Sequence, residues 1–160
     1  YRDGLKELEK LGVDFIVMVC NTIHLYYERL QKEINTPILD LRDELRKVLR
    51  KEGIKSTLIL GTQNTIKRGL YRFKGIKSFE PNNEEIKRLT EAIFNFNKGY
   101  NKRNQIKEVI KICKKYLNEG AVTIILGCTE FAVMLSGENL PVINTIDVLV
   151  EATIQESLSR

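Results

Sequence analysis

Two stretches of this chain repeat one pattern, an apolar run that ends in a cysteine and a threonine. The first run covers residues 14–19 and leads into the motif CNTIH at 20–24. The second run covers residues 121–126 and leads into the motif GCTE at 127–130. A short apolar run bounded by polar turn residues is typical of a buried strand. The pattern therefore predicts two strands that each deliver a cysteine to the turn before a helix.

The rest of the chain alternates between strand and helix signals. Further strands are expected at 57–60, 76–79 and 141–143, with a short extended piece at 37–39. Helices are expected at 1–11, 21–33, 41–52, 66–71, 86–96, 106–117 and 146–157, with a loop at 61–65. Strands separated by helices indicate an α/β fold with a mostly parallel sheet flanked by helices. In such sheets ligands bind beyond the carboxyl ends of the strands, where Cys20, Thr62 and Cys128 are expected.

Composition favours an ordinary globular protein of a reducing compartment. The chain has 160 residues, of which 42% are hydrophobic and 29% are charged. No run of about eighteen apolar residues and no signal peptide is present, so neither a membrane span nor secretion is expected. Three cysteines without a secretory signal favour the cytoplasm, and Cys113 lies on an apolar helix stripe as a core residue. The net charge of +5 comes largely from lysines on helix faces, and no nucleic-acid-binding module is recognisable.

Two thiols at opposed strand ends suit proton transfer at the Cα atom of an amino acid. One thiolate removes the proton from one face while one thiol donates a proton to the other face. Unpaired N–H groups at a helix start are expected to lower the pKa of a thiol. Asn21, Thr22, Thr62 and Thr129 add side-chain donors for the α-carboxylate of the substrate, and these four residues are expected to hold its α-carboxylate and amino group. His24 and Glu130 lie close enough in sequence to orient or deprotonate a thiol.

The two motifs, in this order, resemble the aspartate/glutamate racemase superfamily, and within it the aspartate racemase branch. The cysteines are 128 − 20 = 108 positions apart, which suits one whole domain between them. The stretches at 61–65 and 69–71, and Pro81 with Glu85, resemble further family segments. The resemblance implies two pseudo-symmetric α/β domains that each contribute one cysteine, no cofactor, no metal and a homodimer. It also implies that Lys98 binds the side-chain carboxylate of the substrate.

The same resemblance predicts how the chain divides into domains. Residues 38–140 are expected to form the second racemase domain. Residues 1–37 with 141–160 are expected to form a first domain that lacks its N-terminal strand. Two further positions depart from the family pattern, because Asn144 stands where aspartate is usual and Leu149 where many members have histidine.

The sequence therefore predicts a racemase of aspartate, or of aspartate and glutamate, in which Cys20 and Cys128 exchange the roles of acid and base. Two alternatives remain open at this stage. One is an inactive fragment or ligand-binding relative that keeps the family fold, and the other is a related dicarboxylate isomerase. Individual residues also have simpler interpretations, since Thr62 and Thr65 could cap a helix and Lys98 could face solvent.

Overall fold

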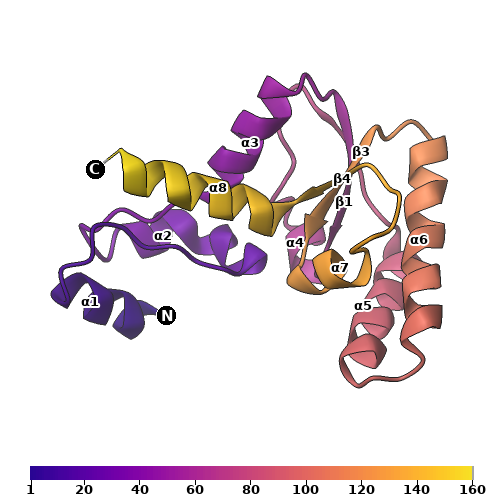
Figure 1. Ribbon diagram of the computed structural model, residues 1–160, viewed down its shortest axis with the longest axis horizontal. Coiled ribbons are helices and arrows are strands. Elements are labelled where there is room, and N and C mark those ends of the chain that lie inside the picture. The colour runs from indigo at the N-terminus through magenta and orange to yellow at the C-terminus, as the bar shows by residue number, and fades with distance from the viewer. Residues whose placement is uncertain (160) are drawn as a thin grey trace.

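A four-stranded parallel sheet forms the centre of the molecule (Figure 1). The computed structural model describes residues 1–159. The strand order is β2-β1-β3-β4, and every neighbouring pair is parallel. The strands are β1 (Ser56–Gly61), β2 (Lys77–Phe79), β3 (Thr123–Gly127) and β4 (Val142–Asn144). The expected α/β class is confirmed.

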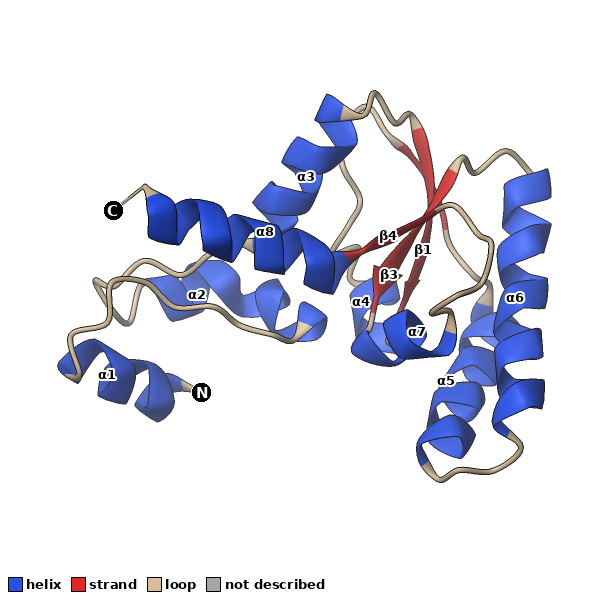
Figure 2. Cartoon of the chain, in the orientation of Figure 1, coloured by secondary structure: helices blue, strands red, loops and turns tan. Residues whose placement is uncertain are grey.

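Helices cover both faces of the sheet (Figure 2). The helices are α1 (Arg2–Lys10), the 3-10 helix η1 (Asn21–Tyr26), α2 (Tyr27–Gln31), α3 (Leu41–Lys51), α4 (Gln63–Lys67), α5 (Asn83–Asn97), α6 (Lys102–Asn118), α7 (Thr129–Met134) and α8 (Thr145–Leu158). Helices α5 and α6 form a hairpin at one side of the sheet, while α3 and α8 lie together at the other. No helix in residues 1–159 is long and apolar enough to cross a membrane.

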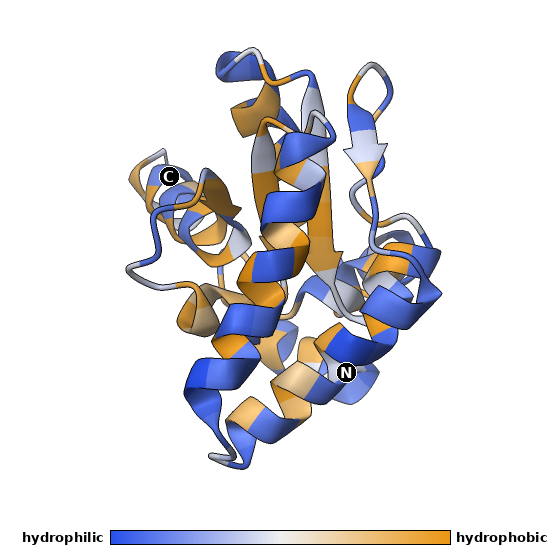
Figure 3. Cartoon of the chain, turned by 90° about the vertical axis from the view of Figure 1, so that its right-hand side faces the viewer, coloured by the Kyte–Doolittle hydropathy of each residue, from blue (hydrophilic) through white to orange (hydrophobic). Residues whose placement is uncertain are grey.

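The two central strands are buried on both faces, which explains their continuous apolar sequence. Side chains alternate between the faces, so Leu58 and Ile124 join the core beneath α5 and α6. Ile59 and Ile125 join a second core beneath α3, α4 and α8. Figure 3 shows the matching pattern, with polar and apolar residues mixed along the outer helices and an apolar strand behind them. Cys113 is fully buried in the first core, as its place on the apolar stripe predicts.

The N-terminal part of the chain, residues 1–38, has a small core of its own and very little sheet. Its buried residues are Leu5, Ile16, Met18, Ile23, Leu30, Ile34 and Ile38. The strand expected at 14–19 is reduced to one parallel bridge between Ile16 and Ile38. That expectation was wrong in extent, because a strand needs a bonded neighbour along its length and this segment has one only at Ile16. Val19 is consequently 62% exposed.

The helix expected at 21–33 is also different, since it is divided into η1 and the short helix α2. Asparagine and threonine at its start compete for backbone hydrogen bonds and favour turns over regular helix. The boundary expected after residue 140 falls just before β4, which pairs with β3 in the central sheet. Helix α8 then returns alongside Val17 and Val19. The division into two domains stays a prediction.

Candidate active site

The register of the two central strands brings two predicted site residues together. Gly61 at the end of β1 pairs with Gly127 at the end of β3, so Thr62 and Cys128 follow side by side. A Cβ atom on Gly61 would lie 2.7 Å from the Cγ2 atom of Thr65. A Cβ atom on Gly127 would lie 2.7 Å from the carbonyl oxygen of Leu60. Both strand ends therefore require glycine for the close approach of their neighbours.

Cys20 and Cys128 line the same cavity, which has a volume of about 220 Å³. The residues around it are Val19, Cys20, Asn21, Thr22, Thr62, Gly127, Cys128, Thr129 and Glu130. Seven of the nine predicted site residues are in this set, and His24 and Lys98 are not. Segments far apart in the sequence, around residues 20, 62 and 128, thus meet at one place.

Cys128 carries its proton and is hydrogen-bonded within the site. Its Sγ atom donates to Oε2 of Glu130 at 2.8 Å, and the Thr129 hydroxyl donates to the same oxygen at 2.9 Å. Burial, followed by the hydrogen bond to Glu130, raises the pKa of Cys128 to about 12. The hydrogen bond from Cys128 lowers the pKa of Glu130, so the proton stays on sulfur. The expected lowering of the thiol pKa was wrong for Cys128, because burial and the carboxylate outweigh the start of a six-residue helix.

Cys20 has a different environment. It lies in extended backbone directly before η1, and its side chain is exposed. In the described part of the chain its thiol makes no hydrogen bond. The two thiols of the cavity therefore differ in solvent access and in partners, although their sequence motifs are alike.

Three threonine hydroxyls join the two halves of the site. The Oγ1 atom of Thr22 lies 3.0 Å from that of Thr62 and 3.0 Å from that of Thr65. The Thr62 and Thr65 hydroxyls are 3.1 Å apart, which closes the triangle. Thr62 also accepts a hydrogen bond from the backbone N–H of Thr65 and so caps α4. Thr62 therefore caps a helix and lines the cavity at once.

The side chain of Asn21 is held by Tyr71, a residue that the two cysteine motifs do not include. The hydroxyl of Tyr71 donates to Oδ1 of Asn21, and both side chains are buried. The Nδ2 atom of Asn21 is buried and has no partner within residues 1–159. In the sequence Tyr71 stood out only as part of a stretch resembling the family, although a buried tyrosine generally needs a polar partner for its hydroxyl.

His24 is fully buried and does not line the cavity of the thiols. Its Nε2 atom lies 3.1 Å from the carbonyl oxygen of Met18, and its Nδ1 atom lies 3.8 Å from Oδ1 of Asp40. Burial lowers the pKa of His24, which keeps the ring neutral. Asp40 is in turn bound by the guanidinium of Arg42. These contacts tie the segment before Cys20 to the start of α3.

Lys98 ends α5 outside the cavity. Its ammonium group lies 4.1 Å from the ring centre of Phe94, a cation–π contact on an exposed surface. The preceding residue, Asn97, lies close enough to Glu130 for its side chain to help lower the pKa of that carboxyl. The end of α5 therefore reaches the site, but the described position of Lys98 does not bring its charge to the two thiols.

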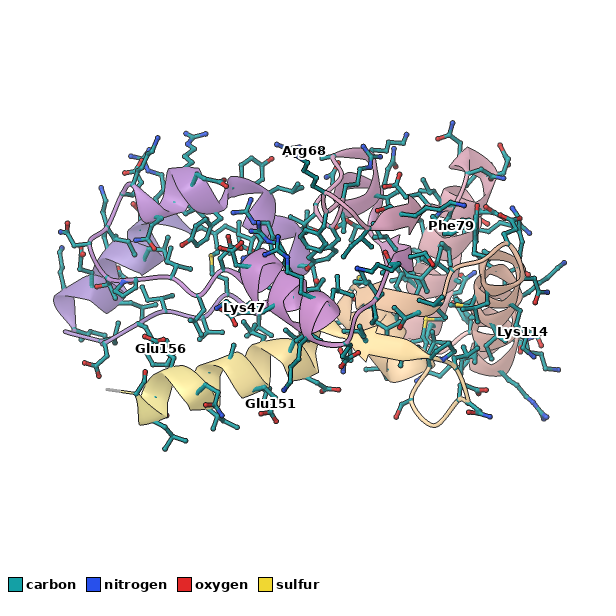
Figure 4. The ribbon with its side chains drawn as sticks, turned by 90° about the horizontal axis from the view of Figure 1, so that it is seen from above. Lys47, Arg68, Phe79, Lys114, Glu151 and Glu156 are labelled. Carbon is teal, nitrogen blue, oxygen red and sulfur yellow. The ribbon has the colours of Figure 1, made fainter. Side chains whose placement is uncertain are left out.

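A larger cavity of about 900 Å³ lies between α3 and α8, where Lys47, Glu151 and Glu156 are found (Figure 4). It contains none of the predicted site residues. The described residues include no cluster of three or more His, Cys, Asp or Glu side chains that could hold a metal ion.

The protein has a parallel α/β sheet in which Cys128 lies beyond the end of β3, and Cys20 lines the same cavity from the N-terminal part of the chain. Comparison with known proteins gives the family: residues 2–153 match the family described as Asp/Glu/hydantoin racemase. The chain belongs to this family, and the resemblance of its motifs is confirmed.

Individual relatives agree with that assignment. The chain is 27% identical to the broad specificity amino-acid racemase RacX of Bacillus subtilis over 98% of the chain and 70% of that protein. It is 30% identical to a glutamate racemase of Aquifex pyrophilus over 79% of the chain and 50% of that protein. A solved structure of an aspartate racemase homologue from Pyrococcus horikoshii superimposes with a TM-score of 0.79 at 28% identity, over 96% of this chain and 71% of that one. The chain thus spans between half and about 70% of these relatives.

Proposed function

We propose that this chain forms the catalytic part of a cofactor-independent amino-acid racemase that acts on aspartate, or on aspartate and glutamate. The observation that carries the proposal is the shared cavity, which Cys20 and Cys128 line together with hydroxyl and amide donors. The printed names of the relatives support an amino-acid substrate, since they include an amino-acid racemase and a glutamate racemase. Their difference in substrate leaves the choice between aspartate and glutamate to experiment.

In the proposed reaction Cys20 acts first as the base. Its thiolate takes the Cα proton, and the electron pair left on Cα is delocalised into the α-carboxylate. Cys128, held as a thiol beside Glu130, donates its proton to the opposite face of Cα. Inversion leaves Cys20 protonated and Cys128 as thiolate, so the reverse reaction uses the same two groups with exchanged roles. Two protons change partner, one from Cα to Cys20 and one from Cys128 to Cα, and no other bond is broken.

The donors around the thiols have the complementary task of holding the carboxylate. Asn21, Thr22, Thr62 and Thr129 surround the cavity and place hydroxyl and amide groups around the substrate. Such donors stabilise the negative charge that develops on the carboxylate as the Cα proton leaves. In the proposal His24 positions the backbone before Cys20, and Glu130 controls the protonation of Cys128. Lys98 is retained as a residue for the distal carboxylate, which requires it to leave the Phe94 ring.

The racemase proposal is tested by following the optical activity of D- and L-aspartate and of D- and L-glutamate separately. We expect the unmodified chain to bring each pair toward a racemic mixture. Cys20→Ser and Cys128→Ser should each lower the rate by at least about 10²-fold, the usual contribution of an acid or base. Cys113→Ser is the matched control, because that thiol is buried in the core away from the cavity. The proposal would be contradicted if all three variants lost the same fraction of the racemisation rate, or if the unmodified chain did not racemise either amino acid.

A ligand-binding relative without turnover is the second candidate, favoured by the exposed position of Cys20 and by the segment before it, which makes only one bridge. This candidate predicts binding of aspartate or glutamate in calorimetry with no change in optical activity.

The racemase proposal also includes a cytoplasmic location and a homodimer. Sedimentation of the purified protein tests the homodimer, and a fully active monomer would contradict it.

A further inference from the structure

The polar atoms of the cavity include one donor without a partner. Asn21 is 4% exposed, and its Nδ2 group makes no hydrogen bond among residues 1–159. A buried amide group left without a partner costs free energy, so native proteins usually satisfy it with protein, water or ligand. Because Asn21 also lines the cavity of the two thiols, a bound ligand is the natural acceptor for this group.

The orientation of that donor depends on Tyr71. A side-chain amide carries its oxygen and its nitrogen on opposite branches, so fixing the oxygen fixes the direction of the NH₂ group. The Tyr71 hydroxyl donates to the Asn21 oxygen, and the Asn21 nitrogen is left without a partner among residues 1–159. Burial raises the pKa of Tyr71, so its hydroxyl keeps the proton that it donates.

The end of β3 determines where the Tyr71 ring can lie. A Cβ atom on Gly127 would lie 3.1 Å from Cε2 of Tyr71, a distance tighter than ordinary contact. The ring is 1% exposed and packs in the core beneath α3, α4 and α8. The Tyr71 ring therefore lies between the core and the backbone of Gly127, which precedes Cys128. Its hydroxyl donates a hydrogen bond to Asn21, which follows Cys20.

We propose that Tyr71 is a positioning residue of this site, which holds Asn21 so that its Nδ2 group binds the α-carboxylate of the substrate. The inference rests on the proposed racemase function for the identity of the ligand. Tyr71 does not contact the substrate itself. It acts through Asn21 and at the same time links the two halves that carry the thiols.

The test is a double-variant comparison of Tyr71→Phe and Asn21→Ala, measured as racemisation of aspartate. Tyr71→Phe keeps the ring and removes only the hydroxyl. We expect it to raise KM about tenfold, the effect of misplacing one hydrogen bond to a charged group, with a smaller change in kcat. The double variant should be no worse than Asn21→Ala alone, since Tyr71 acts through Asn21.

Tyr116→Phe is the matched control. Tyr116 is another buried tyrosine, and its hydroxyl donates to Glu85 at 2.6 Å, away from the cavity. Both tyrosine variants should lower Tm, but only Tyr71→Phe should raise KM. An unchanged KM in Tyr71→Phe, or losses that simply add in the double variant, would overturn the inference while leaving the racemase proposal intact.

A measurement on the unmodified protein covers the case in which Tyr71→Phe does not fold. The side-chain NH₂ signals of Asn21 are identified in a ¹⁵N spectrum by their loss in Asn21→Ala, and racemic aspartate is then added. A shift of these signals on saturation supports the inference, even if the protein does not racemise aspartate and the proposed function fails. Unmoved signals in a protein that binds aspartate would overturn it, and absence of any binding would overturn both proposals.

Discussion

The two cysteine turns have nearly the same sequence pattern but lie in different surroundings. Strand β3, before Cys128, is bonded to β1 on one side and to β4 on the other, and all five of its residues are buried. The segment before Cys20 has a single bridge, and Val19 is exposed. The thiols differ accordingly, since Cys128 is partly buried and bound to Glu130 while Cys20 is exposed. An apolar run becomes a strand only where neighbouring strands are present to accept its hydrogen bonds.

The difference also suggests a division of labour. A buried thiol beside a carboxylate retains its proton and suits the donor role. An exposed thiol such as that of Cys20 can be reached by solvent and by substrate. In the proposed mechanism the sheet half of the molecule therefore supplies the acid, Cys128, and the N-terminal half supplies the exposed thiol of Cys20, which acts first as the base.

The residue that precedes each cysteine gives the largest expected difference in stability. Gly127→Ala places a Cβ atom 2.7 Å from the backbone oxygen of Leu60, which cannot move without disturbing β1. We expect a loss of about 1–3 kcal/mol in the free energy of unfolding, the usual cost of overpacking. Val19→Ala removes an exposed side chain and should cost less than about 0.5 kcal/mol. Urea unfolding measures both, and equal losses would show that the two turns are packed alike.

Acid should weaken the N-terminal half first. His24 is the one histidine of the chain, and burial lowers its pKa below the ordinary value of 6.5. At a pH between these two pKa values, His24 therefore binds a proton in the unfolded chain but not in the folded chain. The free energy of unfolding therefore has its full value above pH 6.5. As the pH decreases below 6.5 it falls by at most about 1.4 kcal/mol per pH unit, until the pH reaches the lowered pKa of His24.

Hydrogen exchange resolves this effect by region. Between pH 6.5 and 5, protection of residues 21–31 should decrease after correction for the intrinsic exchange rate, while that of 123–127 should change little. A parallel decrease in both regions would show that the two halves unfold as one unit. No decrease in either region would show that His24 is protonated in the folded protein without cost.

The smallest expected effect concerns the protonation of Cys128. Glu130→Gln removes the negative charge that helps to raise the pKa of the thiol. The pKa should fall but stay above its ordinary value, because burial is the larger cause. Alkylation of Cys128 by iodoacetamide at pH 8.5 should become roughly threefold to tenfold faster, since the thiolate is the reactive form.

Mass spectrometry of the labelled peptides compares all three thiols in one sample. Cys20 should react first in both proteins because it is exposed, and the buried Cys113 should stay unlabelled. A slower reaction of Cys128 in Glu130→Gln would mean that Glu130 activates the thiol as a base instead of holding it as an acid.

The sequence was sufficient to predict the alternation of strands and helices, and seven of the nine expected site residues line one cavity. Strands β1 and β3 are buried on both faces, so their sequences are continuous apolar runs that predict strands clearly. The apolar run at 14–19 looks the same, but strand formation depends on partners that its own residues do not reveal. The thiol pKa was predicted in the wrong direction for Cys128, because it depends on burial and on the side-chain orientation of Glu130.

Other features of the site needed three-dimensional contacts. Tyr71 reaches Asn21 from fifty positions away in the chain, a pairing that no local pattern indicates. His24 belongs to a cysteine motif, yet its side chain turns toward Met18 and Asp40. Lys98 has a sequence position that suits a substrate role, and its observed contact with Phe94 leaves that role a prediction.

The most direct test of the two-thiol mechanism is deuterium exchange at Cα, measured by NMR for D- and L-aspartate separately in D₂O. In the unmodified protein we predict exchange together with inversion, starting from either enantiomer. Cys20→Ser and Cys128→Ser should each abolish inversion, and any exchange that remains in the two variants should fall on opposite enantiomers. Full racemisation by either variant would show that the two cysteines are not the acid and base of this site.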